Sequence, residues 1–431
     1  MKQKIQSGKG IQTEINIPGD KSISHRSIIF SSLARGKSEI KGFLECEDCL
    51  NTISAFRSLG INIEKIGSGN YIVEGKGING LNKPKDVINC GNSGTTMRLM
   101  TGLLSAQPFY SVLTGDNSLC ERPMDRVIIP LEKMGARIWS RDNKYAPLGI
   151  RGNDNLKGIE YHSPVASAQV KSSLLLAGLY AEGETFVNEP EKSRDHTERM
   201  LKAMGANITI KDNTVSVSQF KDIGLESRLI RVPADISSAA FFMAAGLLLP
   251  DSEIYLKNIG INPTRAGIIE IIKKMGGHIQ LENKRNISGE MIADVLVKSS
   301  ELRGIEVKGD IIPRLIDEIP IITVLGAFAR GRTIIKDAEE LRVKETDRIK
   351  ALYEEFKKIG VEIKEREDGL IIEGNNLIKG GVNVDSRGDH RIAMSLAVAG
   401  LLAENEIIID NCQAVNVSFP GFFELIKMFS K

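Results

Sequence analysis

Apolar positions along this chain fall into six similar segments, each a run of apolar and small residues without a polar face. The runs cover residues 28–34, 99–106, 173–181, 239–249, 319–329 and 392–403. A helix that is apolar all round is buried between other elements, so we predict six buried helices. After each run, polar and apolar residues alternate over a few positions, as in "SEIKGF" at 38–43, which predicts a strand.

Five of the repeats continue with an amphipathic helix that ends in a hydrophobic residue followed by glycine. The pairs are Leu59-Gly60, Met134-Gly135, Met204-Gly205, Met275-Gly276 and Ile359-Gly360. Glycine is common just after a helix C-terminus, because it adopts a positive φ without strain. Two strand-like pieces follow, for example 61–66 and 70–75. The predicted repeat is therefore helix–strand–helix–strand–strand, with a period of about 70 residues.

The six repeats predict an α/β (α+β) protein of two lobes, each built from three repeats. We predict the first lobe at 19–231 and the second at 1–18 plus 232–431. The sixth repeat stops after its second helix, and we expect residues 1–18 to supply its last strands. The chain then crosses between the lobes near residues 18 and 232, which predicts a hinge with a ligand site between the lobes.

Composition narrows the class of protein. The formal net charge is only +2, and general nucleic-acid binding needs a strong basic excess, so we expect no nucleic-acid partner. The N-terminus has no apolar stretch of a signal peptide, and the longest apolar run, 239–250, is too short to cross a bilayer. An odd number of cysteines, five, without a secretory signal indicates reduced thiols in a cytoplasm, and we expect no membrane partner.

Cys46 and Cys49 form a CxxC pair. No second pair and no histidine cluster accompanies them in the sequence, so a metal or redox role is the less favoured interpretation and we expect no metal. The sequence also has no GxSxG motif and no Cys–His pair close together, which favours a reaction without a covalent enzyme intermediate.

Polar residues gather where the buried helices begin, although simple caps would suffice there. Examples are "DKSISHR" at 20–26, "GNSGTTMR" at 91–98, "SAQVKSS" at 167–173 and "DHRIAM" at 389–394. Helix N-termini and glycine-rich turns present free N–H groups to anions, and arginine binds phosphate and carboxylate through two hydrogen bonds. These starts, and those of the second helices, contribute eight cations: Lys21, Arg26, Arg98, Arg122, Arg194, Lys344, Arg348 and Arg391.

Two acidic residues stand among these cations. Asp317 precedes an apolar helix, and Glu345 lies three residues before Arg348 on one predicted helical face. Both are candidates for proton transfer. The alternative is that each cluster is a capping box with a surface ion pair, but surface pairs stabilise proteins too little to explain several clusters in register.

The motifs "GDKSISHRS", "GNSGTTMR", "ERPMDR", "SAQVKSS", "RVKETDR", "GDHRIAM" and "SFPGFF" follow one another along the whole chain. In this order they resemble the 5-enolpyruvylshikimate-3-phosphate synthases, which are enolpyruvyl transferases. The resemblance implies two lobes of three repeats each, an inverted α/β barrel. It also implies transfer of the enolpyruvyl group of phosphoenolpyruvate to the 5-hydroxyl of shikimate 3-phosphate, with release of phosphate and without a cofactor. We expect the first lobe to bind mainly shikimate 3-phosphate, and the second to bind mainly phosphoenolpyruvate and to carry catalysis. A hinged enzyme of this kind needs no second chain, so we expect a monomer.

The resemblance also implies roles for single residues, with catalysis assigned to Asp317, Glu345 and Lys21. Asp317 would orient or deprotonate the attacking hydroxyl, and Glu345 would protonate the methylene carbon. His390 would at most support these two acids. The residues implied for shikimate 3-phosphate are Lys21, Ser22, Arg26, Ser167, Gln169, Arg194, Asp317 and Lys344. Those implied for phosphoenolpyruvate are Lys21, Gly94, Arg122, Gln169, Arg348 and Arg391.

One position departs from the family pattern. Many members carry a lysine two residues before the C-terminal Phe-Pro, where it contacts phosphoenolpyruvate, and here this residue is Val417. Val417 and the motifs "CGNSGTTMR", "RPMDR", "RDHTE" and "NPTR" resemble those of a subclass that often tolerates the inhibitor glyphosate. We therefore expect tolerance.

Three other interpretations stay open. The enolpyruvyl transferase that acts on UDP-N-acetylglucosamine has Lys-Asn where this chain has Lys21-Ser22, and its reactive cysteine lies farther from an Arg-Pro than Cys120 does here. Cys120 is therefore expected to be a packing residue. RNA 3'-terminal phosphate cyclase is related by fold, but its catalytic motif has no match in this chain. A non-catalytic repeat protein that binds phosphorylated metabolites would keep the arginines without needing Asp317 and Glu345.

Overall fold

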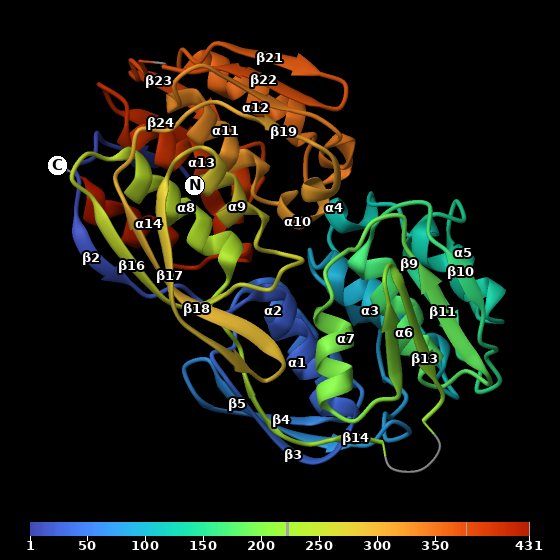
Figure 1. The fold of residues 1–431 in the computed structure, drawn as a ribbon. Helices are drawn as coiled ribbons and strands as arrows, with labels where there is room; N and C mark the ends of the chain where they lie inside the picture. Colours follow the sequence, from blue (N-terminus) through green and yellow to red (C-terminus); the bar gives the residue numbers. More distant parts are fainter. Residues whose placement is uncertain (221–223, 376, 431) are drawn as a thin grey trace. The chain divides into compact units, whose positions relative to one another are not determined.

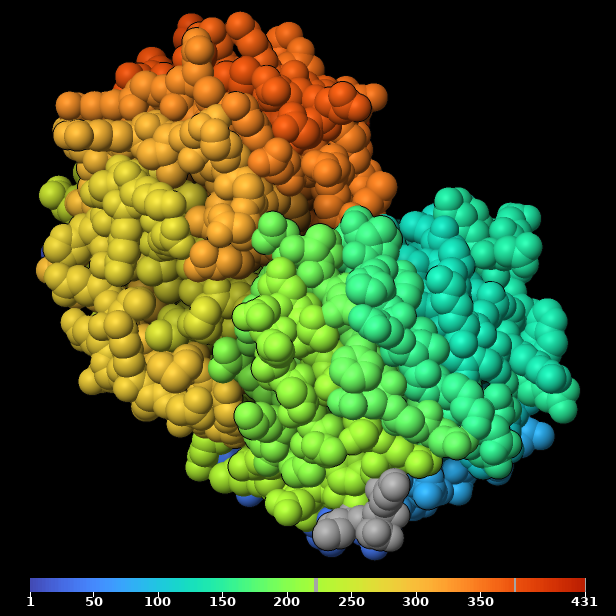
Figure 2. Space-filling model, turned by 45° about the vertical axis from the view of Figure 1, so that its right-hand side comes forward, coloured from blue at the N-terminus to red at the C-terminus, as the bar shows by residue number. Residues whose placement is uncertain are grey.

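The structure is a computed structural model, and it describes residues 1–220, 224–375 and 377–430 (Figure 1). It divides into two compact units. The first lobe comprises Gly19–Pro233 and Ile287–Glu290, and the second comprises Met1–Pro18, Ala234–Asn286 and Met291–Lys431. Each lobe has its own hydrophobic core. On the face drawn in Figure 2, residues of the second half of the chain (yellow to red) form one continuous surface.

The six apolar runs form six buried helices, as predicted. These are α1 (Lys21–Leu33), α3 (Gly94–Ser105), α6 (Ala168–Gly178), α8 (Ile236–Leu248), α11 (Ile319–Phe328) and α13 (His390–Leu401). Their small residues let helices approach closely. A Cβ on Gly102 of α3 would collide with the carbonyl oxygen of Ser173 on α6. In the second lobe, α8, α11 and α13 all contact one another.

The amphipathic helices follow, and five of the six end at a glycine. They are α2 (Glu47–Ser58), α5 (Asp125–Lys133), α7 (His196–Ala203), α9 (Gly267–Lys274), α12 (Arg348–Lys358) and α14 (Phe422–Ile426). The glycines predicted to end the first five have φ between +83° and +98°. Since an L side chain rarely adopts this φ, the sequence signal was reliable. Shorter helices are α4 (Asn117–Cys120), α10 (Ile312–Leu315) and the 3₁₀ turns Gly309–Ile311, Glu339–Val343, Cys412–Val417 and Lys427–Phe429.

The described residues also form six sheets. In the first lobe, the first sheet contains β14 (Leu225–Glu226) and β15 (Leu229–Arg231) beside β3 (Ala34–Lys41), followed by β5 (Asn70–Lys76) and β4 (Asn62–Gly67). The second contains β6 (Ile88–Asn89), β7 (Tyr110–Thr114), β9 (Tyr145–Arg151) and β8 (Arg137–Arg141). The third contains β10 (Glu160–His162), β11 (Glu184–Asn188), β13 (Thr214–Ser218) and β12 (Ile208–Lys211). In the second lobe the sheets are β17 (His278–Ile287), β18 (Glu290–Lys298), β16 (Glu253–Gly260) and β2 (Gln12–Ile15); β19 (Glu306–Val307), β20 (Arg332–Ile335), β22 (Gly369–Glu373) and β21 (Ile363–Arg366); and β1 (Gln3–Ile5), β24 (Ile407–Asp410) and β23 (Val382–Asp385).

The predicted repeat lacked one strand. A short strand precedes each of four buried helices and pairs in parallel with the strand after it: β6 with β7, β10 with β11, β19 with β20, and β23 with β24. The repeat is therefore strand–helix–strand–helix–strand–strand. The leading strands have two to four residues, which is too short for an alternating pattern to stand out in the sequence.

The expectation for residues 1–18 was correct for one strand and wrong for the other. β1 pairs with β24 and completes the sixth sheet, but β2 pairs in parallel with β16 of the fourth repeat. In turn β14 and β15, which precede the fourth repeat in sequence, pair with β3 of the first. The first and fourth repeats therefore exchange their leading strands. Each of these strands lies just before the chain crosses to the other lobe, and it pairs with a sheet of the lobe that the chain is leaving.

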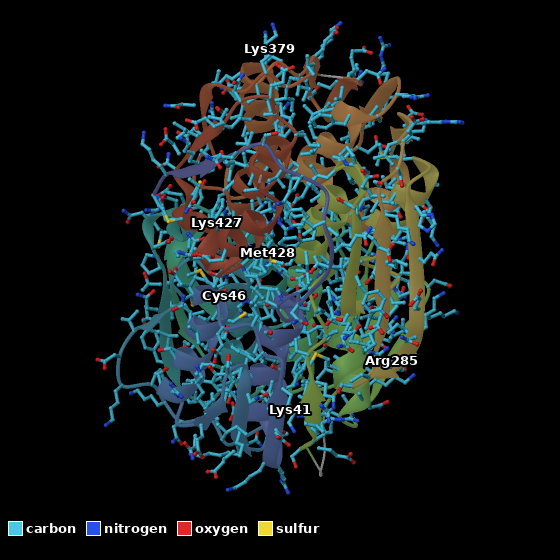
Figure 3. The ribbon with its side chains drawn as sticks, turned by 90° about the vertical axis from the view of Figure 1, so that its left-hand side faces the viewer. Lys41, Cys46, Arg285, Lys379, Lys427 and Met428 are labelled. Carbon is cyan, nitrogen blue, oxygen red and sulfur yellow. The ribbon has the colours of Figure 1, made fainter. Side chains whose placement is uncertain are left out.

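Side chains follow the predicted division between core and surface (Figure 3). Cys46 is fully buried, whereas Lys379 lies exposed at the surface. Four phenylalanines of the second lobe, Phe242, Phe419, Phe422 and Phe429, pack ring against ring in its core. Among the described residues, no helix is long and apolar enough to span a membrane.

Candidate active site

Three buried helices of the second lobe begin at an acidic N-cap residue. Asp235 caps α8 and accepts a hydrogen bond from the Ser237 amide at 2.8 Å. Asp389 caps α13 and accepts from the amides of Arg391 (2.8 Å) and Ile392 (3.3 Å). Glu318 is the N-cap residue of α11. Carboxylates are favourable at helix N-termini, where they meet free N–H groups and the positive end of the dipole.

Arg348 lies at the centre of this cluster and is almost completely buried. Its Nε donates to Asp389 at 2.8 Å, and its two terminal nitrogens lie 2.6 Å from Glu345 and 3.3 Å from Asp317. Burial opposes its charge, but Asp389, Glu345 and Asp317 outweigh burial and raise the pKa of Arg348. The guanidinium therefore stays charged, and it orients both acids for which the sequence predicted proton transfer.

Arg391 is the second arginine of the cluster. Its terminal nitrogens contact the Asp317 carbonyl oxygen at 3.0 Å and the Asp317 carboxylate at 3.4 Å. It also lies 3.9 Å from the buried carboxylate of Glu318. Asp317 thus bridges Arg348 and Arg391, and it keeps 15% of its side-chain surface exposed.

Lys344 completes the predicted second-lobe residues. Its ammonium lies 3.4 Å from Glu340, and about a quarter of the side chain is exposed. Burial lowers the pKa of Lys344, and the nearby carboxylates of Asp317 and Glu340 only partly oppose this effect.

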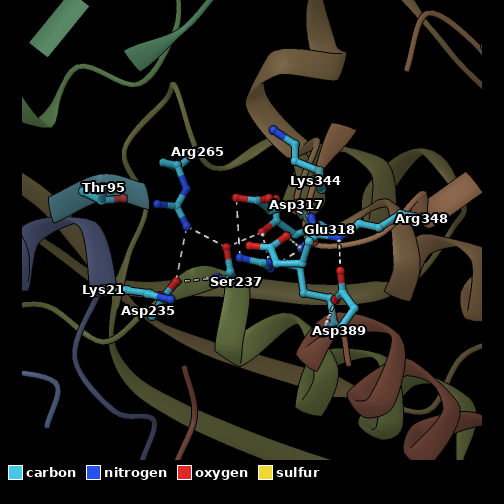
Figure 4. A network of polar contacts seen from close by, with 12 residues as sticks. Lys21, Thr95, Asp235, Ser237, Arg265, Asp317, Glu318, Lys344, Arg348 and Asp389 are labelled. Atoms are coloured by element: carbon cyan, nitrogen blue, oxygen red, sulfur yellow. Dashed lines mark hydrogen bonds and ion pairs between the residues drawn. The ribbon is translucent and has the colours of Figure 1, made fainter. Parts of the chain in front are cut away.

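The network extends to residues that the sequence analysis did not select (Figure 4). The buried Arg265 donates to the Ser237 hydroxyl at 2.6 Å and lies 3.3 Å from Asp235, and Ser237 donates to Glu318. In the sequence, Asp235 and Ser237 resemble an ordinary helix cap and gave no sign of this network. The available signal was the arginine of "NPTR", which lies at the start of a second helix like the cations that were selected.

In the first lobe, Arg26 is held without a direct carboxylate partner among the described residues. Its Nε donates to the Thr197 hydroxyl at 2.7 Å, and its terminal nitrogens donate to the Ser172 hydroxyl at 2.8 Å and to the Ser22 carbonyl oxygen at 3.1 Å. Burial lowers the pKa of Arg26 to about 10, with the Glu198 charge opposing and the Arg194 charge adding to the decrease. The positive charge of Arg194 therefore contributes to the electrostatic surroundings of Arg26.

Lys21 is the first residue of α1, and its ammonium lies 2.5 Å from Asp48. Burial opposes the charge, but Asp48 outweighs it and raises the pKa of Lys21. Asp48 lies in the first turn of α2, two residues from Cys46, and was not selected from the sequence.

A neighbouring set surrounds the glycine-rich turn. Arg98 donates to the Gln169 side-chain oxygen at 2.6 Å, and the Gln169 amide nitrogen donates to Thr95 at 3.0 Å. Arg122 donates to the carbonyl and side-chain oxygens of Asn92 and to the Ser118 hydroxyl. A Cβ on Gly94 would lie 3.0 Å from an Arg98 nitrogen and 3.7 Å from an Arg122 nitrogen. Gly94 thus leaves room beside two guanidinium groups.

Ser167 has a local structural partner. It is the N-cap residue of α6, its hydroxyl accepts from the Val170 amide at 3.4 Å, and its own amide donates to Glu189. The capping alternative was therefore correct that these polar residues cap helices. It was wrong about surface ion pairs, because Arg348 and Asp389 are buried.

Other residues singled out in the sequence lie in ordinary surroundings. Cys120 donates to the Gly115 carbonyl oxygen at 3.4 Å. Cys46 and Cys49 are fully buried, and no cluster that could hold a metal occurs among the described residues. His390 is buried as the first residue of α13. Val417 is partly buried at the end of a 3₁₀ turn.

Comparisons with known proteins give one consistent result. The family model described as EPSP synthase (3-phosphoshikimate 1-carboxyvinyltransferase) matches residues 5–426. The 3-phosphoshikimate 1-carboxyvinyltransferase of Petrotoga mobilis is 53% identical over 99% of both chains, and that of Brevibacillus brevis is 52% identical over 99% of this chain and 100% of that protein. A 2.37 Å structure of EPSP synthase from Acinetobacter baumannii is similar with a TM-score of 0.90 and 46% identity, covering 100% of this chain and 98% of that one.

Proposed function

The chain belongs to the EPSP synthase (3-phosphoshikimate 1-carboxyvinyltransferase) family, and we propose that its two polar clusters divide the binding of the two substrates. The protein is a carboxyvinyl transferase, which transfers the enolpyruvyl group of phosphoenolpyruvate to shikimate 3-phosphate. The match over nearly the whole chain is the observation that carries this conclusion.

In this proposal the first lobe binds mainly shikimate 3-phosphate. Arg26, Arg194 and Lys21 supply positive charge near α1, and Ser22, Ser167 and Gln169 supply polar groups. The charge of Arg194 helps to lower the pKa of Arg26, and this supports the role, because a dianionic phosphate relieves the repulsion between two cations. Gly94 and Arg122 are assigned to phosphoenolpyruvate, since Gly94 leaves space beside the Arg122 guanidinium.

The second lobe binds mainly phosphoenolpyruvate and carries the proton transfers. Arg348 and Arg391 hold its phosphate and carboxylate groups. Both arginines also contact Asp317, and Arg348 contacts Glu345, so an anion that binds them competes with these carboxylates. Asp317 and Glu345 lose part of their positive surroundings as the substrate arrives. Such a loss raises the proton affinity of a carboxylate, which suits Asp317 as acceptor of the hydroxyl proton and Glu345 as the acid.

The chemistry follows an addition and an elimination. Asp317 orients or deprotonates the attacking hydroxyl, and Glu345 protonates the methylene carbon of phosphoenolpyruvate. Elimination of phosphate then reverses these roles, so that Glu345 takes a proton back from the methylene-derived carbon. The arginines and Lys344 stabilise the leaving phosphate. We assign Lys344 to the reacting oxygen, and its lowered pKa suits this role, because such a lysine exchanges a proton more easily.

Further parts of the proposal concern subclass and cellular context. We place the chain in the glyphosate-tolerant subclass, supported by Val417 and its surrounding motifs. A micromolar inhibition constant for glyphosate, competitive with phosphoenolpyruvate, would contradict this assignment. We also propose a cytoplasmic monomer, which size-exclusion chromatography with light scattering tests.

Phosphate release from purified protein tests the activity directly. Shikimate 3-phosphate and phosphoenolpyruvate are the substrates, and UDP-N-acetylglucosamine is the parallel acceptor. Release with the first acceptor alone is the expected result. Release with the second acceptor alone, or with neither, would refute the assigned reaction.

A further inference from the structure

Arg26 is oriented by two hydroxyl groups from two different helices. Thr197 lies on α7 and Ser172 on α6, and both side chains are fully buried. Their oxygens accept from Arg26 at 2.7 Å and 2.8 Å. These two contacts hold the edge of the guanidinium formed by Nε and one terminal nitrogen, which fixes its plane.

The hydroxyl protons of this pair have defined destinations. Ser172 donates to the Ala168 carbonyl oxygen at 2.5 Å, so its proton is not available to Thr197. The two hydroxyl oxygens lie 2.6 Å apart, and Thr197 is therefore the donor to Ser172. Both oxygens then turn lone pairs toward Arg26. The chain of donors runs from Arg26 through Thr197 and Ser172 to the backbone, and each of these groups is satisfied.

Neutral acceptors at this position have a consequence for charge. Arg348 contacts three carboxylates, which offset most of its charge, whereas Arg26 donates only to uncharged oxygens. The Glu198 carboxylate next to Thr197 lies 2.7 Å from the buried Lys171, so Lys171 partly neutralises it. Hydroxyls thus orient Arg26 without cancelling the charge that an anion would meet.

We propose that Thr197 and Ser172 are positioning residues, which hold Arg26 so that its charge is presented to the phosphate of the acceptor substrate. This inference rests on the proposed function of Arg26. It names a specificity determinant that contacts the arginine rather than the substrate. The hydroxyl of Thr197 is the central element, because it links Arg26 to Ser172.

The isosteric variant Thr197→Val tests the proposal. It leaves a buried charged donor without its acceptor, so we expect the KM for shikimate 3-phosphate to rise about 10- to 100-fold. The kcat and the KM for phosphoenolpyruvate stay near wild-type values, which a general structural defect would not achieve. Thr197→Ser keeps the hydroxyl and restores the KM.

The chain offers matched controls for both hydroxyls. Thr185 and Ser173 are fully buried in the same lobe, and their hydroxyls have no hydrogen-bond partner among the described residues. Thr185→Val therefore removes a buried hydroxyl that does not reach Arg26. Ser172→Ala against Ser173→Ala repeats the comparison at adjacent positions of α6, and it decides the question if Thr197→Val does not fold.

Several results would overturn the inference. One is an equal KM for shikimate 3-phosphate in Thr197→Val and Thr185→Val, or in Ser172→Ala and Ser173→Ala when Thr197→Val does not fold. Another is an equal rise in KM for Thr197→Val and Thr197→Ser. Arg26→Gln separates this proposal from the one it rests on. If that variant binds shikimate 3-phosphate as well as wild type, the assigned role of Arg26 fails. If Arg26→Gln loses affinity and Thr197→Val does not, only the positioning role fails.

Discussion

Replacement of Lys171 by methionine gives the largest stability effect that we predict for the first lobe. The Lys171 ammonium is 1% exposed and lies 2.6 Å from Glu189 and 2.7 Å from Glu198, which are 2% and 1% exposed. Methionine keeps the length of the side chain but leaves two buried carboxylates without their cation. Removing one partner of a buried ion pair typically costs about 3–5 kcal/mol, so we expect a loss of this size in the free energy of unfolding.

The loss in the free energy of unfolding depends on pH, and the protonation of Glu198 determines the direction of this dependence. Burial already raises the pKa of Glu198 even though Lys171 opposes this, and the variant loses the opposing charge. The folded variant therefore binds a proton that the unfolded chain has released, and its stability falls as pH rises. As the pH falls, the difference in the free energy of unfolding between the variant and wild type decreases. The decrease is about 1.4 kcal/mol per pH unit for each additional proton that the folded variant binds.

Urea denaturation of both proteins from about pH 8 to about pH 6 measures the effect. The control is Lys157→Met, because Lys157 forms an exposed pair with Glu182 and exposed pairs contribute about 0–1 kcal/mol. A loss for Lys171→Met as small as that of the control would refute the argument. A large loss that does not change with pH would refute the role assigned to Glu198.

Three further predictions concern the activity. Glu345→Gln should lower kcat by about 10²- to 10⁴-fold with a small change in both KM values, as measured by steady-state phosphate release, and unchanged turnover would exclude Glu345 as the acid. Gly94→Ala places a methyl group 3.0 Å from an Arg98 nitrogen and 3.7 Å from an Arg122 nitrogen, so we expect a higher KM for phosphoenolpyruvate, and an unchanged value would contradict the assignment of this turn. Asp48→Asn removes the carboxylate that raises the pKa of Lys21, so the alkaline limb of the pH–rate profile should move to lower pH. An unmoved limb would show that Lys21 does not titrate in that limb.

The sequence by itself determined the elements that depend on local patterns. Six apolar runs became six buried helices, and five glycines ended amphipathic helices at positive φ, because burial and backbone strain act on each segment wherever it lies. The order of the motifs also determined the family. Arg26, Asp317 and Arg348 were selected as charged residues near helix starts, since that position and residue type are visible in the chain, and their roles in the reaction stay predictions.

Only the tertiary structure decided which segments pair and which side chains meet. β2 pairs with a strand of the fourth repeat, and β15 pairs with a strand of the first. Neither strand has a sequence pattern that specifies its partner, because strand pairing depends on a neighbour distant in sequence. The sequence likewise did not indicate the partners of Thr197 and Arg265. Packing brings these side chains to Arg26 and Ser237. Their hydrogen bonds of 2.6–2.7 Å form only once the segments that carry them are in place.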